Sequence, residues 1–203
     1  MKNMLMTVAL AGAFALPAAA QTGTGSSTAP KPATHATMHS EQSAKTVAPA
    51  DKAFAHEAAI GGMAEVALGN LAKEKASSPD VKAFGDRMVN DHGKANDQLK
   101  DWAQKNDVTL PTQLDAKHKA LQDRLSKLSG DAFDKAYMRA MLTDHKEDVA
   151  KFRTESKSAR NSDLKEWAGD TLPTLQDHLK MAQDTASKVG IPTATSGKGH
   201  PKK

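Results

Sequence analysis

Apolar side chains recur at steps of three and four residues from about residue 51 to about residue 189, and this spacing constrains the fold more than any other feature. It places the apolar side chains along one face of a helix, whereas a half-buried strand would need strict alternation. Prolines, glycines and serines interrupt the pattern at short intervals. We therefore expect five helices, over residues 51–76, 79–106, 113–128, 131–158 and 162–189.

The lengths of the breaks predict how these helices are connected. The turns between the first and second helices and between the fourth and fifth are tight, so each of these pairs should run antiparallel. The third helix, about 16 residues long at about 1.5 Å per residue, covers about 24 Å and can cross back along the others. The sequence therefore predicts an all-α fold: a ferritin-like up-down four-helix bundle with one short extra crossover helix.

Residues 1–20 have the features of a secretory signal peptide. Lys2 supplies a positive start, residues 4–16 form an apolar run, and three alanines precede a cleavage point ahead of Gln21. The run is too short to cross a bilayer comfortably, since a transmembrane helix needs about 20 apolar residues; an uncleaved anchor is the alternative. No later stretch is more apolar, so we expect no transmembrane segment after signal removal. The protein should be exported, and either periplasmic or secreted, or associated with the outer membrane.

Two further segments lack the apolar residues that a folded core needs. Residues 21–50 are rich in Ala, Thr, Ser and Pro, and residues 190–203 combine prolines with a basic end. Such a composition cannot bury enough surface to offset the entropy of ordering. We therefore expect a disordered linker over 21–50, a helical domain over 51–189 and a basic disordered tail over 190–203.

Composition excludes several kinds of chemistry. The chain has no cysteine, which rules out disulfides, thiolate nucleophiles and iron–sulfur ligation. The formal net charge is +4, but acidic residues are interleaved with the lysines along each predicted helix, so no basic face suits a nucleic acid. The sequence contains no Gly-x-Ser-x-Gly motif, phosphate-binding glycine loop or dinucleotide fingerprint. These absences favour a protein that does not bind nucleic acid and is not an enzyme.

An internal similarity draws attention to three Asp-His pairs. Residues 82–92 and 135–145 match at a constant offset and both end in Asp-His, and residues 175–178 repeat the end of the pattern as Leu-Gln-Asp-His. Each of these histidines falls on the apolar seam of its helix and so replaces a core residue. On the first helix, Glu65 occupies the matching position in the seam.

The four long helices are thus predicted to turn one coordinating side chain inward at a similar depth. Buried imidazole without a partner costs several kcal/mol, so these groups should bind a metal or one another. We predict a metal site whose ligands are Glu65, His92, His145 and His178. The residues before the histidines are candidates for orienting the imidazoles from outside: Asp91, Asp144 and Asp177. The alternative is a polar layer in which the same side chains satisfy one another and set the helix register.

The identity of the metal stays open between copper, zinc and iron. The Glu-x-x-His motif of di-iron bundles is missing from the long helices, which disfavours di-iron chemistry. Met88 and Met141 each precede a seam histidine by four residues, and mixed imidazole and thioether surroundings would suit copper as soft ligands. Methionines at this spacing also fill cores, so packing alone is the competing explanation.

Three separated segments resemble a known bacterial family. They are residues 54–66, 88–92 and 172–178, and they fall in order as in the family catalogued as domain of unknown function 4142. The resemblance covers about residues 51–185 and implies a ferritin-like bundle in an exported protein, for which outer-membrane or secreted labels are common. It implies no particular activity.

We therefore expect an exported periplasmic helical-bundle protein that binds a transition metal in the bundle interior, for metal handling or envelope stress protection. The alternative is a noncatalytic structural or interaction protein of the cell envelope, with an envelope protein or a second copy of the chain as its partner. The two hypotheses differ in whether the interior histidines take up metal.

Overall fold

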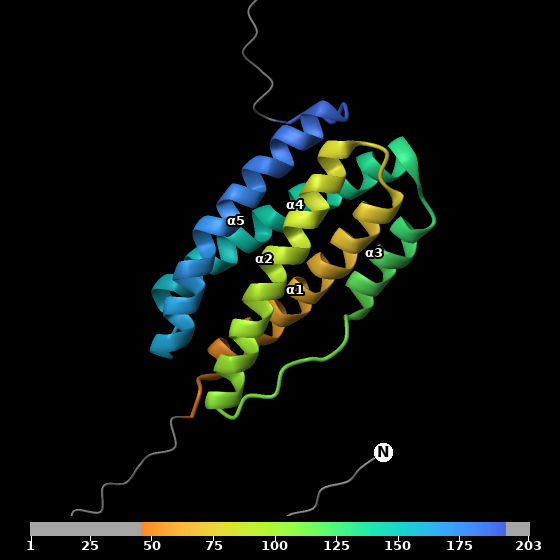
Figure 1. Cartoon of the computed structure of the whole chain (residues 1–203). Coiled ribbons are helices and arrows are strands. Elements are labelled where there is room, and N and C mark those ends of the chain that lie inside the picture. Colours follow the sequence, from red (N-terminus) through yellow and green to blue (C-terminus); the bar gives the residue numbers. More distant parts are fainter. Residues whose placement is uncertain (1–45, 194–203) are drawn as a thin grey trace, which may run out of the picture. The chain divides into compact units, whose positions relative to one another are not determined.

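The computed structural model describes residues 46–193, and this part of the chain forms helices joined by irregular segments, without strands (Figure 1). The helices are α1 (Pro49–Lys75), α2 (Pro79–Lys105), α3 (Ala116–Ser126), α4 (Gly130–Ser158) and α5 (Ser162–Lys188). The all-α prediction is confirmed. The expected signal peptide and most of the expected linker and tail lie outside the described residues. None of these helices combines the length and the apolar character that crossing a membrane requires.

The helices differ from their predicted bounds mainly at the starts of α1 and α3. α1 begins at Pro49, which suits a first-turn position because its missing N–H would have no helical partner. Val47 is also buried, so the last residues of the expected linker belong to the fold. α3 begins later than expected, at Ala116, because the Asp115 carboxylate caps it by accepting a hydrogen bond from the backbone N–H of His118.

α3 is too short to span the domain by itself. Its 11 residues cover about 16 Å at about 1.5 Å each, and the irregular segment 106–115 makes up the rest of the path from α2 (Figure 1). α3 packs against α1 and α4, and Leu125 is its one buried residue. The crossover is therefore partly loop and partly helix, where the sequence predicted a longer helix.

The four long helices pack as two hairpins, α1 with α2 and α4 with α5, and contacts of α2 with α5 and of α1 with α4 join the hairpins. α1 and α2 approach closely at Gly69 and Gly85. A Cβ atom added at Gly69 would lie 2.7 Å from the carbonyl oxygen of Gly85. Only hydrogen fits between the two backbones, so both positions require glycine.

In each hairpin, a buried aspartate accepts hydrogen bonds from the backbone of the turn in the other hairpin. At the start of α4, the Asp134 carboxylate accepts hydrogen bonds from the backbone N–H groups of Ser77 and Ser78, at 3.2 and 2.8 Å. At the start of α1, Asp51 accepts a hydrogen bond from the N–H of Asn161, at 2.7 Å. α2 and α4 therefore start at the same end of the domain and run parallel. Ser78, at the N-cap of α2, makes no side-chain cap hydrogen bond; the Asp134 carboxylate accepts from the backbone of this turn instead.

The core of the helical domain consists of two hydrophobic clusters with a polar layer between them. On each long helix, one buried polar residue separates the buried residues of one cluster from those of the other. These residues are Glu65, His92, His145 and His178. The four side chains therefore share one level of the core, which agrees with the similar depth that the sequence predicts.

Candidate metal centre

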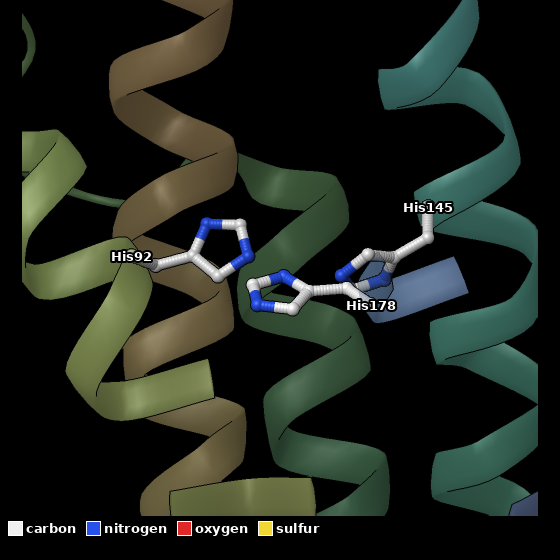
Figure 2. A group of neighbouring side chains, drawn as sticks. All are labelled: His92, His145 and His178. Carbon is white, nitrogen blue, oxygen red and sulfur yellow. The ribbon is translucent and has the colours of Figure 1, made fainter. Parts of the chain in front are cut away.

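Three imidazoles from different helices meet in the polar layer. His92 of α2, His145 of α4 and His178 of α5 point toward one another (Figure 2), and each offers a ring nitrogen within 4.8 Å of the others. Their ring centroids lie 5.3, 5.4 and 5.8 Å apart. The three residues are 7, 0 and 1% exposed, so the nitrogens meet away from bulk water.

In two of these imidazoles, one ring nitrogen makes a hydrogen bond to a residue outside the group of three. We call this nitrogen the outer nitrogen. His145 Nδ1 donates to the backbone carbonyl of Met141, at 3.0 Å, and His178 Nε2 donates to the Asp91 carboxylate, at 2.9 Å. Because these oxygens only accept, the proton sits on the outer nitrogen and the other nitrogen keeps a free lone pair. The nitrogens left over, His145 Nε2 and His178 Nδ1, are buried without a hydrogen-bond partner in the described part of the chain, and so is His92 Nε2.

The interior keeps these imidazoles neutral. Burial lowers the pKa of His92 well below its usual value, and the neighbouring His145 and His178 lower it further. Burial lowers the pKa of His145 to about 4, with His178 adding to the effect. For His178, burial outweighs the opposing hydrogen bond to Asp91, so its pKa is lowered too. Neutral imidazole is the form that binds metal ions, so no ligand has to lose a proton at neutral pH.

Asp91 supports His178 from the edge of the site. Its side chain is 17% exposed, and its Oδ2 atom also accepts a hydrogen bond from Arg87 Nε, one turn earlier on α2. Burial alone would raise the pKa of Asp91, but the hydrogen bonds from His178 and Arg87 bring it below its usual value. An ionised carboxylate on the outer nitrogen is typical of metal-binding histidines. The sequence prediction missed Arg87, although an Arg-Asp pair four residues apart on a helix is a recognisable signal.

Glu65 belongs to the polar layer but not to the group of three nitrogens. Its Oε1 atom lies 3.5 Å from His145 Nδ1, the nitrogen that faces Met141 rather than the other imidazoles. The side chain is fully buried, and neither oxygen accepts a hydrogen bond from the residues that the structure describes. Burial, and after it the neighbouring Asp144, raises the pKa of Glu65 well above its usual value. The structure thus places Glu65 beside an outer nitrogen, where the sequence suggested a ligand at the shared point.

The other predicted residues lie in different surroundings. Asp144 is half-buried next to Glu65, and Asp177 is exposed. Among the described histidines none donates a hydrogen bond to either of them, so within residues 46–193 Asp91 alone has the contact that was expected of all three aspartates. Met88 and Met141 are fully buried in the hydrophobic cluster that adjoins the site, and their use as soft ligands stays a prediction. Met141 contributes its backbone carbonyl instead, which no side-chain pattern reveals.

The chain matches a family model described as a domain of unknown function (DUF4142) over residues 36–185. The match spans most of the chain and includes the whole polar layer. The chain therefore belongs to the DUF4142 family, and the resemblance carried by the three sequence segments is confirmed. It matches none of the curated proteins.

Solved structures of low sequence identity share the fold. A DUF305 fragment from Deinococcus radiodurans superposes with a TM-score of 0.62 at 13% identity, covering 70% of this chain and 98% of that one. A DUF305 protein from Streptomyces coelicolor, for which secretion has been proposed, gives 0.60 at 15% identity over 74% and 96% of the two chains. CopM in its Cu(II)-bound form gives 0.58 at 16% identity over 68% and 96%. At these identities the likeness concerns the fold alone.

Proposed function

We propose that the domain binds a transition-metal ion between His92, His145 and His178, and that it handles metal rather than catalysing a reaction. The observation that carries this proposal is the convergence of three buried ring nitrogens that lack hydrogen-bond partners within the described residues. An unpaired buried polar group costs about 1–3 kcal/mol. A metal ion would satisfy all three nitrogens at once, and its binding free energy would stabilise the fold.

Copper is the metal we favour. Neutral imidazole suits copper, zinc and iron, and CopM, which shares the fold, has Cu(II)-bound and Cu(I)-bound forms. Metal–nitrogen bonds of about 2.0–2.1 Å in a tetrahedral site place the nitrogens about 3.3 Å apart. Binding would therefore draw the nitrogens together from separations of up to 4.8 Å, a change that rotation of the imidazoles can supply.

The carboxyl groups around the imidazoles support this proposal. Asp91 holds the outer nitrogen of His178, and Glu65 lies beside the outer nitrogen of His145. Such outer carboxylates orient metal-binding imidazoles and increase their basicity. The ionised Asp91 carboxylate would also offset the positive charge of an ion in an interior that screens charge weakly.

We further propose that the protein is exported and that its fold is a ferritin-like bundle. The features of residues 1–20 favour a secretory signal, and the parallel course of α2 and α4 agrees with a bundle that has one crossover connection. Metal handling or protection against envelope stress is the role that this location and this site would fit.

The alternative is an envelope protein whose polar layer is architectural. It is favoured by the contacts that already satisfy part of the layer, those of Asp91 with His178 and of Met141 with His145. The histidines would then set the register of the helices and take up no metal. Its partner would be an envelope protein or a second copy of the chain.

Metal analysis of the chain, purified without an affinity tag, separates the two functions. After loading with copper and dialysis, we expect about one ion per chain in the wild type and none at this site in His92→Leu or His145→Leu. Leucine replaces each imidazole with an apolar group of similar size, so both variants should fold. His56→Leu is the matched control, because it removes an exposed histidine and should bind like the wild type.

Two results would contradict the metal function. Substoichiometric metal under every loading condition would leave the architectural alternative. Full copper content in both leucine variants would show that the ion binds elsewhere on the chain.

A further inference from the structure

A hollow of about 310 Å³ lies on the surface between α2 and α5. Arg87, Asp91 and Lys94 line it from α2, and Asp170 and Thr174 line it from α5. The hollow therefore offers an approaching cation both carboxylate oxygens and opposing positive charges.

One side chain connects this hollow with the buried histidines. Asp91 is 17% exposed, and it accepts the hydrogen bond from His178, whose side chain is 1% exposed. His145, by contrast, has the buried Glu65 carboxylate and the buried Phe84 ring as neighbours. A cation that leaves the solvent at this hollow meets a carboxylate that is one hydrogen bond away from an imidazole.

Arg87 engages the same carboxylate oxygen. Its Nε donates to Asp91 Oδ2 from one turn earlier, while its own side chain is 49% exposed. A carboxylate paired with a guanidinium attracts a second cation weakly, so a metal ion binds Asp91 faster once Arg87 has turned away. Displacement is easy, because an exposed ion pair contributes little to stability and the guanidinium can turn into solvent.

We propose that the Arg87–Asp91 ion pair is the entry point of the metal site. Asp91 takes the cation from the hollow when Arg87 turns away and releases it toward the imidazoles once the hydrogen bond from His178 Nε2 opens. Arg87 then pairs with Asp91 again. This inference rests on the proposed function, since it describes how metal reaches the three histidines. Within the described residues the hydrogen bond of Arg87 goes to Asp91 and not to an imidazole, so Arg87 acts mainly on the rates of uptake and release and much less on the affinity.

Stopped-flow kinetics with Cu²⁺ test this role. Uptake is followed by mixing the chain with Cu²⁺, and release by adding a chromogenic copper chelator to the loaded chain. The variants are Arg87→Gln and Lys94→Gln, each of which removes one positive charge from the same hollow, while only Arg87 bonds to Asp91. We expect Arg87→Gln to show uptake and release rates about tenfold higher than those of Lys94→Gln, with dissociation constants equal within about twofold.

Each other outcome has a definite meaning. Equal rates in the two variants would overturn the entry role and leave the metal site intact. Faster release with unchanged uptake in Arg87→Gln would mean that Arg87 only positions Asp91, which also overturns it. A wild-type chain that takes up no copper at equilibrium would overturn the proposed function, and the entry role with it.

Discussion

At the scale of single residues, the partner of each outer ring nitrogen decides which lone pair faces the interior. His178 is oriented by a carboxylate from a neighbouring helix, and His145 by a carbonyl of its own helix. The two partners differ in kind. The carbonyl of Met141 is neutral, whereas Asp91 carries a charge that makes the His178 ring a stronger donor to metal.

Replacing Asp91 with asparagine should therefore weaken metal binding. The amide oxygen can still accept the hydrogen bond, but the negative charge is lost, and we expect the affinity to fall by about 10–100-fold. Competition with a chelator of known affinity measures the change. Asp177→Asn is the control, because Asp177 also precedes a site histidine but is exposed; its affinity should stay within about twofold of the wild type. Equal affinity in the two variants would count against a supporting role for Asp91.

The buried imidazoles should also make stability depend on pH. Histidine in the unfolded chain has a pKa of about 6.5, and burial lowers the pKa of His145 to about 4. Below about pH 6.5 the unfolded chain binds more protons than the folded one, so this contribution to stability is present above that pH and is lost as the pH falls toward 4. At pH 5 one such residue lowers the free energy of unfolding by on the order of 2 kcal/mol relative to neutral pH.

Urea unfolding without added metal, at pH 7 and pH 5, checks this expectation. Between pH 7 and pH 5, the free energy of unfolding of the wild type should fall by on the order of 2 kcal/mol more than that of His145→Leu. Asp148, whose pKa is raised to about 7 by burial and by Asp144, shifts stability in the opposite direction, but it is present in both proteins and its contribution largely cancels. Equal losses would mean that His145 is not kept neutral by burial.

At the scale of helices, the spacing between α1 and α2 depends on a backbone contact. Glycines stand at both sides of that contact, at Gly69 and Gly85. In the structure Gly61 has open space around its Cα, and Gly62 faces the side chain of Asn96.

Gly69→Ala should destabilise the domain. The added methyl group would meet the Gly85 carbonyl oxygen at 2.7 Å, and overpacking against backbone costs about 1–3 kcal/mol because the helices must move apart. Gly61→Ala is the matched control in the same helix, with nothing within 4 Å of the new Cβ. It should gain up to about 1 kcal/mol through helix propensity. Chemical denaturation measures both; a neutral Gly69→Ala would contradict the close approach.

At the scale of the whole molecule, two hydrophobic clusters stabilise the domain and the polar layer between them opposes folding. The layer places three imidazoles and a carboxyl group in the core, where each costs free energy unless it is paired. The same layer would link folding to metal binding, because the unfolded chain does not bring the three helices together.

Metal should therefore raise the melting temperature. A free metal concentration of 100 times the dissociation constant adds about 2.7 kcal/mol, which for a domain of this size corresponds to roughly 5–10 °C. Differential scanning fluorimetry with and without copper measures the shift. His145→Leu should show no shift, and its melting temperature without metal should equal or exceed that of the wild type because a polar group leaves the core. A shift in that variant as large as in the wild type would point to copper bound elsewhere.

Much of this architecture is readable from local sequence. The helix bounds, the apolar seams and the level of the polar layer were all predicted, and the structure agrees except at the start of α1 and over α3. α3 was predicted less well because its length depends on Asp115, a single capping side chain. The sequence did not predict the hydrogen bonds that Asp51 and Asp134 accept from distant turns, because the partners lie far away along the chain.

The sequence by itself determined that helices form, which face of each is buried and how deep along it each coordinating residue lies. These are local quantities, since every residue advances a helix by about 1.5 Å and turns it by about 100°. Tertiary structure alone decided that three imidazoles converge while Glu65 lies beside His145, and that Asp91 contacts an imidazole while Asp144 and Asp177 do not. The physical reason is that these outcomes depend on how far each helix rotates about its axis and how closely it approaches its neighbours, and both follow from side chains on different helices packing against one another.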